Sequence, residues 1–295
     1  MAVSLTIPLP AGYRLRDVLA FHGRDAEGLA EQVGADGLRK GILLEGTPVL
    51  LEIGFAQDAA RCRIAADGKL TARLRAAAEE ALLNMLGLRI DPAAFADAAR
   101  EDPMLGPLLA RQPGLRIVQS ATVFEALTWA IIGQQINLSF AISLRRTLIQ
   151  LAGHPHSSGL WCYPEAADVA RLELEELTSR KFSGAKAETL LRLARLVHEG
   201  ELSLDRERDP QEVSRELLAI KGIGPWTVNY ALLRGYAYAD CSLHGDVAVR
   251  SALHKLAGGE TRPDIAQAER MLERYKPHRT MAAAYLWASL SEQAG

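Results

Sequence analysis

The sequence predicts an α+β domain over residues 1–88, built on an antiparallel sheet, followed by an all-α region over residues 89–295. Before residue 70, short segments of alternating apolar and polar residues are separated by turn-forming positions, a pattern typical of strands. From Asp91 onward these strand signals stop, and apolar residues recur at helical spacing. No internal repeat, low-complexity run or long linker divides this second part. We therefore expect a chain that is mainly α overall, with its C-terminal helices in two lobes.

The N-terminal domain is expected to alternate short strands with two helices. Gly46-Thr47-Pro48 and other turn-forming positions separate the strands. Each of the two helices is recognised by apolar residues that return to one face. The expected elements are strands over residues 3–9, 42–44, 49–55 and 61–64 and helices over residues 16–33 and 70–86.

The second part begins with a long apolar helical region over residues 124–151 that is interrupted by Gly133 and the pair Gln134-Gln135. Buried amides need partners, so this pair either bonds to neighbouring backbone or marks a break in the helix that faces a ligand. Another helix is expected over residues 187–197, after the stretch Ser183-Gly184-Ala185-Lys186, which is a candidate for a second hairpin. Residues 265–291 are again helical.

The stretch over residues 217–250 holds a helical hairpin. A start signal, Asp209-Pro210, predicts a helix that ends near Ile220. Gly222 and Gly224 then allow a tight turn, and Pro225 suits the first position of the next helix. The free N–H groups at that helix start, with the positive end of the helix dipole, favour a phosphate oxygen. An ordinary helix-helix turn is the alternative.

Composition restricts the classes of protein that remain. Thirty-four basic and thirty-six acidic residues give a formal charge of −2, which argues against a protein built only to hold nucleic acid but not against a DNA enzyme. The three cysteines, Cys62, Cys162 and Cys241, form neither a metal cluster nor an even disulfide set, so a reducing cytoplasm is expected. No apolar stretch is long enough to span a bilayer, and the N-terminus lacks the pattern of a signal peptide.

The hairpin and its flanks carry a resemblance to a known family. The run Gly222-Ile223-Gly224-Pro225-Trp226-Thr227 leads to Asp246 and is preceded by FEALTWAIIGQQI. This combination resembles the helix-hairpin-helix (HhH-GPD) DNA glycosylase superfamily and, within it, the DNA-3-methyladenine glycosylase II (AlkA) family. The resemblance implies an α+β N-terminal domain, followed by two helical lobes with the active site in the cleft between them. It also implies base excision repair of alkylated bases of the 3-methyladenine and 7-methylguanine type.

The resemblance assigns the catalytic role to Asp246. A fixed carboxylate beside the anomeric carbon stabilises the positive charge that develops on the sugar when the N-glycosidic bond breaks. Asp246 could alternatively serve only as a helix cap, and the two roles are compatible. Asp240 is the rival carboxylate. Members of the superfamily that also cut the backbone carry a Schiff-base lysine where this chain has Trp226, so the resemblance implies a monofunctional enzyme without lyase activity.

The resemblance also places substrate and DNA contacts. It implies stacking on a flipped base by Trp226, Tyr230 and Trp287, with Phe21 and Tyr13 as weaker candidates and core packing as the alternative for each. Gln135 lies where the family places its intercalating wedge, and Ile136 is the second candidate for that role. The hairpin contacts expected on DNA are Lys221, Gly222, Ile223, Gly224 and Thr227.

Cofactors and partners follow from the same resemblance. The cysteines present cannot build an iron–sulfur cluster, so neither a cofactor nor a metal is expected. The expected partner is double-stranded DNA that contains alkylated bases, bound by a monomer in the cytoplasm at the nucleoid, with no membrane contact. Two other functions remain open: a glycosylase for oxidised, deaminated or mismatched bases, and a non-catalytic helix-hairpin-helix module.

Overall fold

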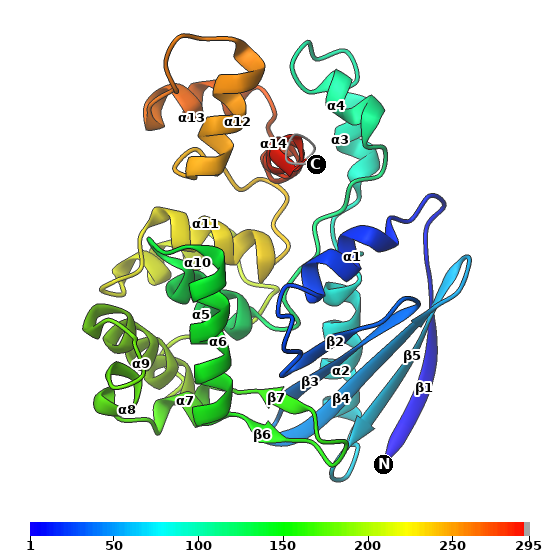
Figure 1. Cartoon of the computed structure of the whole chain (residues 1–295), viewed down its shortest axis with the longest axis vertical. Helices are drawn as coiled ribbons and strands as arrows, with labels where there is room; N and C mark the ends of the chain where they lie inside the picture. Colours follow the sequence, from blue (N-terminus) through cyan, green and yellow to red (C-terminus); the bar gives the residue numbers. More distant parts are fainter. Residues whose placement is uncertain (292–295) are drawn as a thin grey trace.

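A computed structural model describes residues 1–291 (Figure 1). Its sheet has seven strands in the order β1-β5-β4-β3-β7-β6, with β2 paired to β3. The N-terminal strands pair in antiparallel fashion, as predicted. The strands are β1 (Ala2–Pro8), β2 (Glu31–Val33), β3 (Gly37–Leu44), β4 (Thr47–Phe55), β5 (Ala59–Ala66), β6 (His154–Pro155) and β7 (Trp161–Tyr163).

The prediction that residues 89–295 hold only helices is wrong at β6 and β7. These strands have two and three residues, too few for an alternating pattern to be visible in the sequence. They join the N-terminal sheet because β7 pairs in parallel with β3, where Gly41 faces Cys162. A β-carbon at Gly41 would lie 2.2 Å from the carbonyl oxygen of Trp161, so glycine is what allows the two backbones to approach.

The predicted helix over residues 16–33 is also wrong in its second half. Helix α1 (Leu15–His22) ends at Gly23, whose N–H donates to the carbonyl of Leu19. A turn with Gly28 at φ +62° follows, and the chain then enters β2. Glycines that can end a helix therefore divide this segment into a helix, a turn and a strand.

The predicted helix over residues 70–86 is confirmed as α2 (Ala72–Met85), which begins at the N-cap Thr71. Its buried face packs against the sheet in one of the two large hydrophobic cores, together with residues of α1, β1 and β3–β5. Two short helices follow, and the apolar residues of the remaining helices form the other large core. The short helices are α3 (Pro92–Ala99) and α4 (Gly106–Arg111).

The long apolar region of residues 124–151 is divided at Gln134-Gln135, so the predicted break in the helix is present. Gln135 has φ +55°, and Asn137 caps the next helix by accepting from the N–H of Phe140. The region predicted as helical over residues 265–291 is likewise divided into two helices. The central helices are α5 (Val123–Gly133), α6 (Leu138–Ala152), α7 (Ala166–Ala170), α8 (Leu174–Thr178), α9 (Gly184–His198), α10 (Pro210–Ala219) and α11 (Pro225–Arg234).

The last three helices form a second group. They are α12 (Val247–Ala257), α13 (Ile265–Glu273) and α14 (Arg279–Ser291). Helix α14 packs on α12, α13 and also on α3 and α4, so this group joins segments from both ends of the helical region. In Figure 1 the group lies above α5–α11, and α1 lies between it and the sheet. Within residues 1–291 no helix has both the length and the apolarity needed to cross a membrane.

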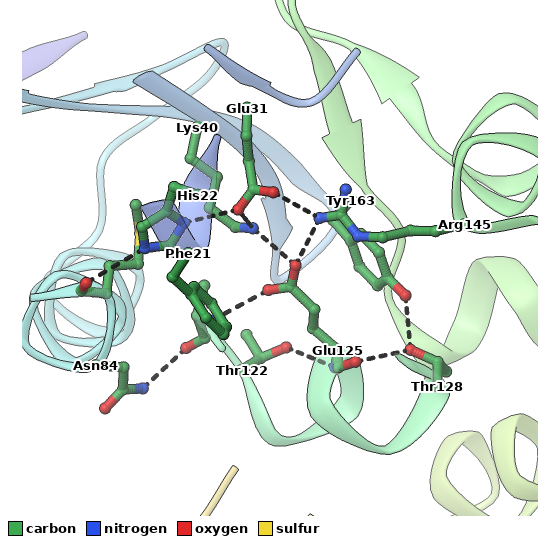
Figure 2. Close-up of polar contacts among 12 residues, drawn as sticks. Phe21, His22, Glu31, Lys40, Asn84, Thr122, Glu125, Thr128, Arg145 and Tyr163 are labelled. Carbon is green, nitrogen blue, oxygen red and sulfur yellow. Dashed lines mark hydrogen bonds and ion pairs between the residues drawn. The ribbon is translucent and has the colours of Figure 1, made fainter. Parts of the chain in front are cut away.

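A buried cluster of charges connects the sheet to the helices (Figure 2). Lys40 of β3 donates to Glu31 of β2 and to Glu125 of α5, each at 2.7 Å. Arg145 of α6 reaches the same two carboxylates, at 3.1 Å and 2.8 Å. The side chain of Lys40 is only 1% exposed. Each buried charge therefore has opposite charges beside it, which is the condition for burying them at all.

The cluster also accounts for the ionisation of its carboxyl groups. Burial by itself disfavours the charged form, but Lys40 and Arg145 outweigh it and hold the pKa of Glu31 well below its usual range. The pKa of the Glu125 carboxyl is lowered by the same two cations. His22 adds a further contact, with its Nδ1 2.9 Å from Glu31 and its Nε2 3.2 Å from the carbonyl of Met85.

Lys40→Met should strongly destabilise the fold. The substitution keeps the volume of the side chain but leaves two buried carboxylates with one cation fewer, and we expect the free energy of unfolding to fall by about 3–5 kcal/mol. Urea denaturation measures it. The matched control is Arg75→Ala, which removes a surface pair with Glu79 from a side chain that is 50% exposed and should cost less than about 0.5 kcal/mol. Equal effects of the two substitutions would contradict the structural role of the cluster.

Candidate active site

The predicted hairpin is present between α10 and α11. Helix α10 ends at Ile220, and Pro225 is the first residue of α11, with Gly224 as its N-cap. Gly222 has φ +98°, a conformation that favours glycine. A β-carbon at Gly222 would lie 2.0 Å from Oγ1 of Thr189 on α9, so the turn packs closely on that helix.

Side chains from two other elements hold the hairpin in place. Gln134 Nε2 donates to the carbonyl of Gly222 at 3.0 Å and to Oγ1 of Thr227 at 2.9 Å. Arg192 of α9 donates to the carbonyl of Lys221 at 2.9 Å. Gln134, one of the two amides that interrupt the apolar helix, thus connects the break after α5 to the hairpin.

The residues predicted to contact DNA differ in their exposure. Lys221 and Gly222 are exposed, whereas Ile223 and Thr227 are buried, and the hydroxyl of Thr227 bonds to Gln134. In this structure the side chains of Ile223 and Thr227 therefore stabilise the turn, and only its backbone and Lys221 face outward.

The two candidates for the wedge, Gln135 and Ile136, directly follow Gln134 in the sequence. Gln135 is exposed at its left-handed position, while Ile136 is half-buried and packs on the helical core. Both line a cavity of about 370 Å³ together with Gly222 of the hairpin. The exposed amide of Gln135 is thus the side chain of the pair that is free to reach a ligand.

Asp246 joins three helices. As the N-cap of α12, its Oδ1 accepts from the N–H of Val249 at 2.9 Å. The same oxygen accepts from Nε1 of Trp287 on α14 at 3.1 Å, and Oδ2 accepts from Nε1 of Trp226 on α11 at 2.9 Å. Three donors face the carboxylate, which is half-buried, and a carboxylate anion accepts on both of its oxygens.

Aromatic rings continue from Trp226 away from the carboxylate. The rings of Trp226 and Tyr230 are 5.3 Å apart at an interplanar angle of 31°. The hydroxyl of Tyr230 accepts from Nε1 of Trp129 at 2.9 Å. Trp129 was absent from the sequence-based candidates because its spacing in α5 is that of an ordinary core residue. The bond to Tyr230 becomes evident only once α5 and α11 are packed together.

Two arginines, Arg24 and Arg234, lie against aromatic rings near Phe21 of α1. The guanidinium carbon of Arg24 is 3.9 Å from the ring centroid of Phe21 and 4.9 Å from that of Trp129. The guanidinium carbon of Arg234 is 4.7 Å from Phe21 and 5.7 Å from Trp287. These distances are typical of cation–π contacts. Sequence reasoning missed both arginines, since neither carries a signal apart from its neighbours in space.

A cavity of about 280 Å³ adjoins this group of rings. Phe21, Arg234 and Trp287 line it, together with Arg116 and the backbone near Val118. Burial lowers the pKa of the Arg234 guanidinium from its usual value. Phe21 from α1 and Trp287 from α14 therefore border the same cavity.

Tyr13 does not lie with the other predicted aromatic residues. Its hydroxyl donates to the carbonyl of Leu86 at 2.6 Å, and its ring stacks on Phe55 at 6.4 Å in the core of the N-terminal sheet. Burial raises the pKa of this hydroxyl, because the ionised form loses its hydration. Tyr13 thus contributes to packing rather than to the group around Asp246.

The rival carboxylate Asp240 has a structural partner. Its oxygens accept from Nε and Nη2 of Arg279 at 2.7 Å and 2.8 Å, at the start of α14. A paired carboxylate of this kind anchors a helix. His244, two residues before Asp246, also has a partner, with its Nδ1 2.8 Å from the hydroxyl of Ser242.

Among residues 1–291, no three His, Cys, Asp or Glu side chains gather in a way that could hold a metal ion.

Gly222→Ala should destabilise the hairpin. The new β-carbon would clash with Thr189 and would force alanine into a left-handed conformation, so we expect a loss of about 2–3 kcal/mol in the free energy of unfolding. Gly224→Ser is the matched control, because that position has an extended backbone, open space around it and a preference for serine as N-cap. A loss below about 0.5 kcal/mol for Gly222→Ala in urea denaturation would contradict the close packing of the turn.

Comparisons with known proteins add to this geometry. The family model of the HhH-GPD superfamily base excision DNA repair proteins matches residues 128–278. A DNA-3-methyladenine glycosylase of Bacillus subtilis is 31% identical over 201 residues, which are 66% of this chain and 66% of that protein. The DNA-3-methyladenine glycosylase 2 of Escherichia coli is 30% identical over 185 residues, which are 62% of this chain and 63% of that protein. The alignments thus span just under two thirds of each relative.

A solved structure has the same fold over nearly the whole chain. The 3-methyladenine DNA glycosylase from Archaeoglobus fulgidus superposes with a TM-score of 0.81 over 96% of this chain and 97% of that chain, at 23% sequence identity. The family model, for its part, covers more than half of the 295 residues, including the hairpin, Asp246 and the break at Gln134. The chain therefore belongs to the HhH-GPD superfamily of base excision DNA repair proteins.

Proposed function

We propose that this chain is a monofunctional DNA glycosylase that removes alkylated bases, of the 3-methyladenine and 7-methylguanine type, and leaves an abasic site. The observation that carries the proposal is the carboxylate of Asp246, held by the indole N–H groups of Trp226 and Trp287. An anion fixed among aromatic rings suits a reaction that develops positive charge on a sugar and takes up a flat base. The names of the relatives from Bacillus subtilis and Escherichia coli support this choice of substrate.

The reaction breaks the bond between C1′ of the deoxyribose and a ring nitrogen of the base. The electron pair of that bond leaves with the base, and the sugar becomes an oxocarbenium-like cation that Asp246 stabilises. Water then adds its oxygen to C1′ and gives up a proton, which Asp246 accepts or passes to solvent. A base alkylated at N3 or N7 is cationic before the bond breaks and leaves as a neutral molecule. No general acid is therefore needed, unlike in hydrolases that use two carboxylates on sugars.

The aromatic side chains would capture the flipped base. Unstacking a nucleotide costs a few kcal/mol, and stacking on an aromatic ring returns about 1–3 kcal/mol per base. Trp226 and Trp287 bond to the carboxylate, Tyr230 packs on Trp226, and Phe21 borders the adjoining cavity, so a base beside Asp246 would meet aromatic side chains. The electron-rich indole rings would favour a cationic base.

The proposed partner is double-stranded DNA that contains the alkylated base, bound by a monomer in the cytoplasm at the nucleoid. The backbone of the hairpin at residues 221–224 and the start of α11 would bind a phosphate. The exposed amide of Gln135 would enter the gap that the flipped nucleotide leaves and would bond to the orphaned base opposite. Gln134 ties this wedge to the hairpin, so both contacts would be made together.

The proposal includes the absence of lyase activity. Strand cleavage by this superfamily requires a lysine amine that forms a Schiff base, and the corresponding position here holds Trp226. An indole cannot form that bond, and its N–H is engaged with Asp246. Lys221 lies on the other side of the turn, exposed to solvent.

Asp246→Asn should abolish base release while leaving the fold intact. Asparagine is as good an N-cap as aspartate, so α12 should still form, but the negative charge at C1′ is lost. We expect the rate of release of 3-methyladenine and 7-methylguanine from methylated duplex DNA to fall about 10²- to 10⁴-fold.

Asp97→Asn serves as the control, since that carboxylate is 73% exposed on α3 and should not affect release. Wild-type protein that frees neither base would contradict the proposed function. An Asp246→Asn variant as active as the wild type would contradict only the role of Asp246.

Borohydride should trap no covalent complex between this chain and DNA that carries a damaged base. Trapping requires a Schiff base, and no amine is expected beside the sugar. Gel electrophoresis after reduction detects the adduct, with a glycosylase/lyase of the same superfamily as the positive control. A trapped adduct that disappears in Lys221→Met would move the chain to the lyase branch.

A further inference from the structure

Arg24 is a cation that lies against Phe21, one of the residues that line the cavity of about 280 Å³. It follows α1 by two residues, and its Nε donates to the carbonyl of Phe21 at 2.6 Å. Its guanidinium group lies against the rings of Phe21 and Trp129. Among residues 1–291, no carboxylate pairs with it. The terminal nitrogens of Arg24 therefore keep their donors available for a ligand, while the rest of the side chain is already positioned.

The position of Arg24 connects it to Asp246 through the aromatic residues. Trp129, on which Arg24 lies, donates to Tyr230, whose ring contacts Trp226, and Trp226 in turn donates to Asp246. On the other side, Phe21 also contacts Arg234, which lies against Trp287. The aromatic residues that are linked to the carboxylate thus contact two cations, Arg24 and Arg234.

The two arginines differ in which of their N–H donors are already bonded within the protein. Arg234 donates from Nη1 to the carbonyl of Val118, and its Nε is buried without a hydrogen-bond partner. Arg234 is thereby tied to the wall, close to the backbone that lines the cavity. Arg24 is half-buried and has only its Nε engaged, so it keeps more free N–H donors than Arg234 with which to bond to a base.

A guanidinium group selects bases by the kind of atom on their edge. It carries five N–H donors and no acceptor, so it bonds to a carbonyl oxygen but not to an amino group. A 7-alkylguanine and a hypoxanthine each present a carbonyl oxygen on the six-membered ring. A 3-alkyladenine presents an amino group at the same place. Hypoxanthine gains further, because it is neutral in DNA and takes up negative charge as it leaves, which a nearby cation stabilises.

We propose that Arg24 is a specificity-determining residue, which makes the pocket prefer carbonyl-bearing bases, namely 7-alkylguanine and hypoxanthine, over 3-alkyladenine. This inference rests on the proposed glycosylase function and adds the substrate class to it. This role explains why cations lie beside a pocket that takes cationic bases. The N–H donors of the arginines would bond to the edge of the base, while Asp246 and the indole rings would attract the positively charged sugar and base.

The test compares lesions that compete in one reaction. Duplex DNA treated with dimethyl sulfate carries both 7-methylguanine and 3-methyladenine, and chromatography of the released bases gives the ratio of their release rates. A duplex with a single hypoxanthine is measured beside it. For Arg24→Met we expect release of 7-methylguanine and hypoxanthine to fall about 10- to 100-fold relative to release of 3-methyladenine, the factor for losing a hydrogen bond to a charged group.

Two further variants distinguish the loss of the hydrogen bonds to the base from the loss of positive charge. Arg24→Lys keeps the charge but loses the planar fork, so it should retain part of the preference. Arg16→Met is the matched control on the preceding helix α1, where the arginine side chain is 70% exposed, and it should leave the ratio unchanged. Because the readout is a ratio of two products from one tube, partial unfolding of a variant lowers both rates and does not change it.

The outcomes are distinct. If Arg24→Met lowers the release of both methylated bases equally, or changes neither, the specificity role is wrong while the glycosylase function stands. If Arg24→Met and Arg16→Met alter the ratio to the same extent, the effect is one of surface charge and the inference is overturned. If wild-type protein releases no base at all, the proposed function and this inference fail together.

Discussion

Two buried cations, Lys40 and Arg145, hold the N-terminal sheet to the helices that carry the candidate site. Their partners Glu31 and Glu125 come from β2 and α5, so neither side can move away without leaving unpaired charge in the interior. The cluster extends through His22 of α1 to Phe21, whose ring meets the imidazole edge-on at 5.2 Å (Figure 2). The position of Phe21 in the pocket wall thus depends on charges buried one layer beneath it.

Asp246 plays a corresponding part on the other side of the site. It caps α12 and accepts from indoles of α11 and α14, so one carboxylate brings together the two groups of helices seen in Figure 1. A residue proposed to stabilise a sugar cation must be held rigidly before the substrate arrives, since preorganised charge acts without reorganisation. The donors that hold Asp246 are also the rings proposed to take the base, which makes the geometry of the pocket and that of the carboxylate interdependent.

The hairpin and the wedge are joined in a similar way. Gln134 bonds to the hairpin carbonyl of Gly222, and Gln135 next to it projects from the break between α5 and α6. A phosphate on the hairpin and a side chain in the DNA stack would therefore be positioned by one short segment. Two adjacent amides thus have different tasks: Gln134 bonds to the backbone of the hairpin, and Gln135 remains exposed to solvent.

Local signals in the sequence were sufficient for the hairpin, the start of α11 at Pro225 and the cap at Asp246, because proline, glycine and a capping side chain act through their immediate neighbours. The resemblance to a family added the assignment of Trp226 and Trp287. The pairing of Gly41 with β7 and the contacts of Trp129, Arg24 and Arg234 with distant aromatic residues were decided only by the tertiary structure. These features join residues that lie far apart in the sequence, and no periodicity in a sequence reports which distant side chains will share one space.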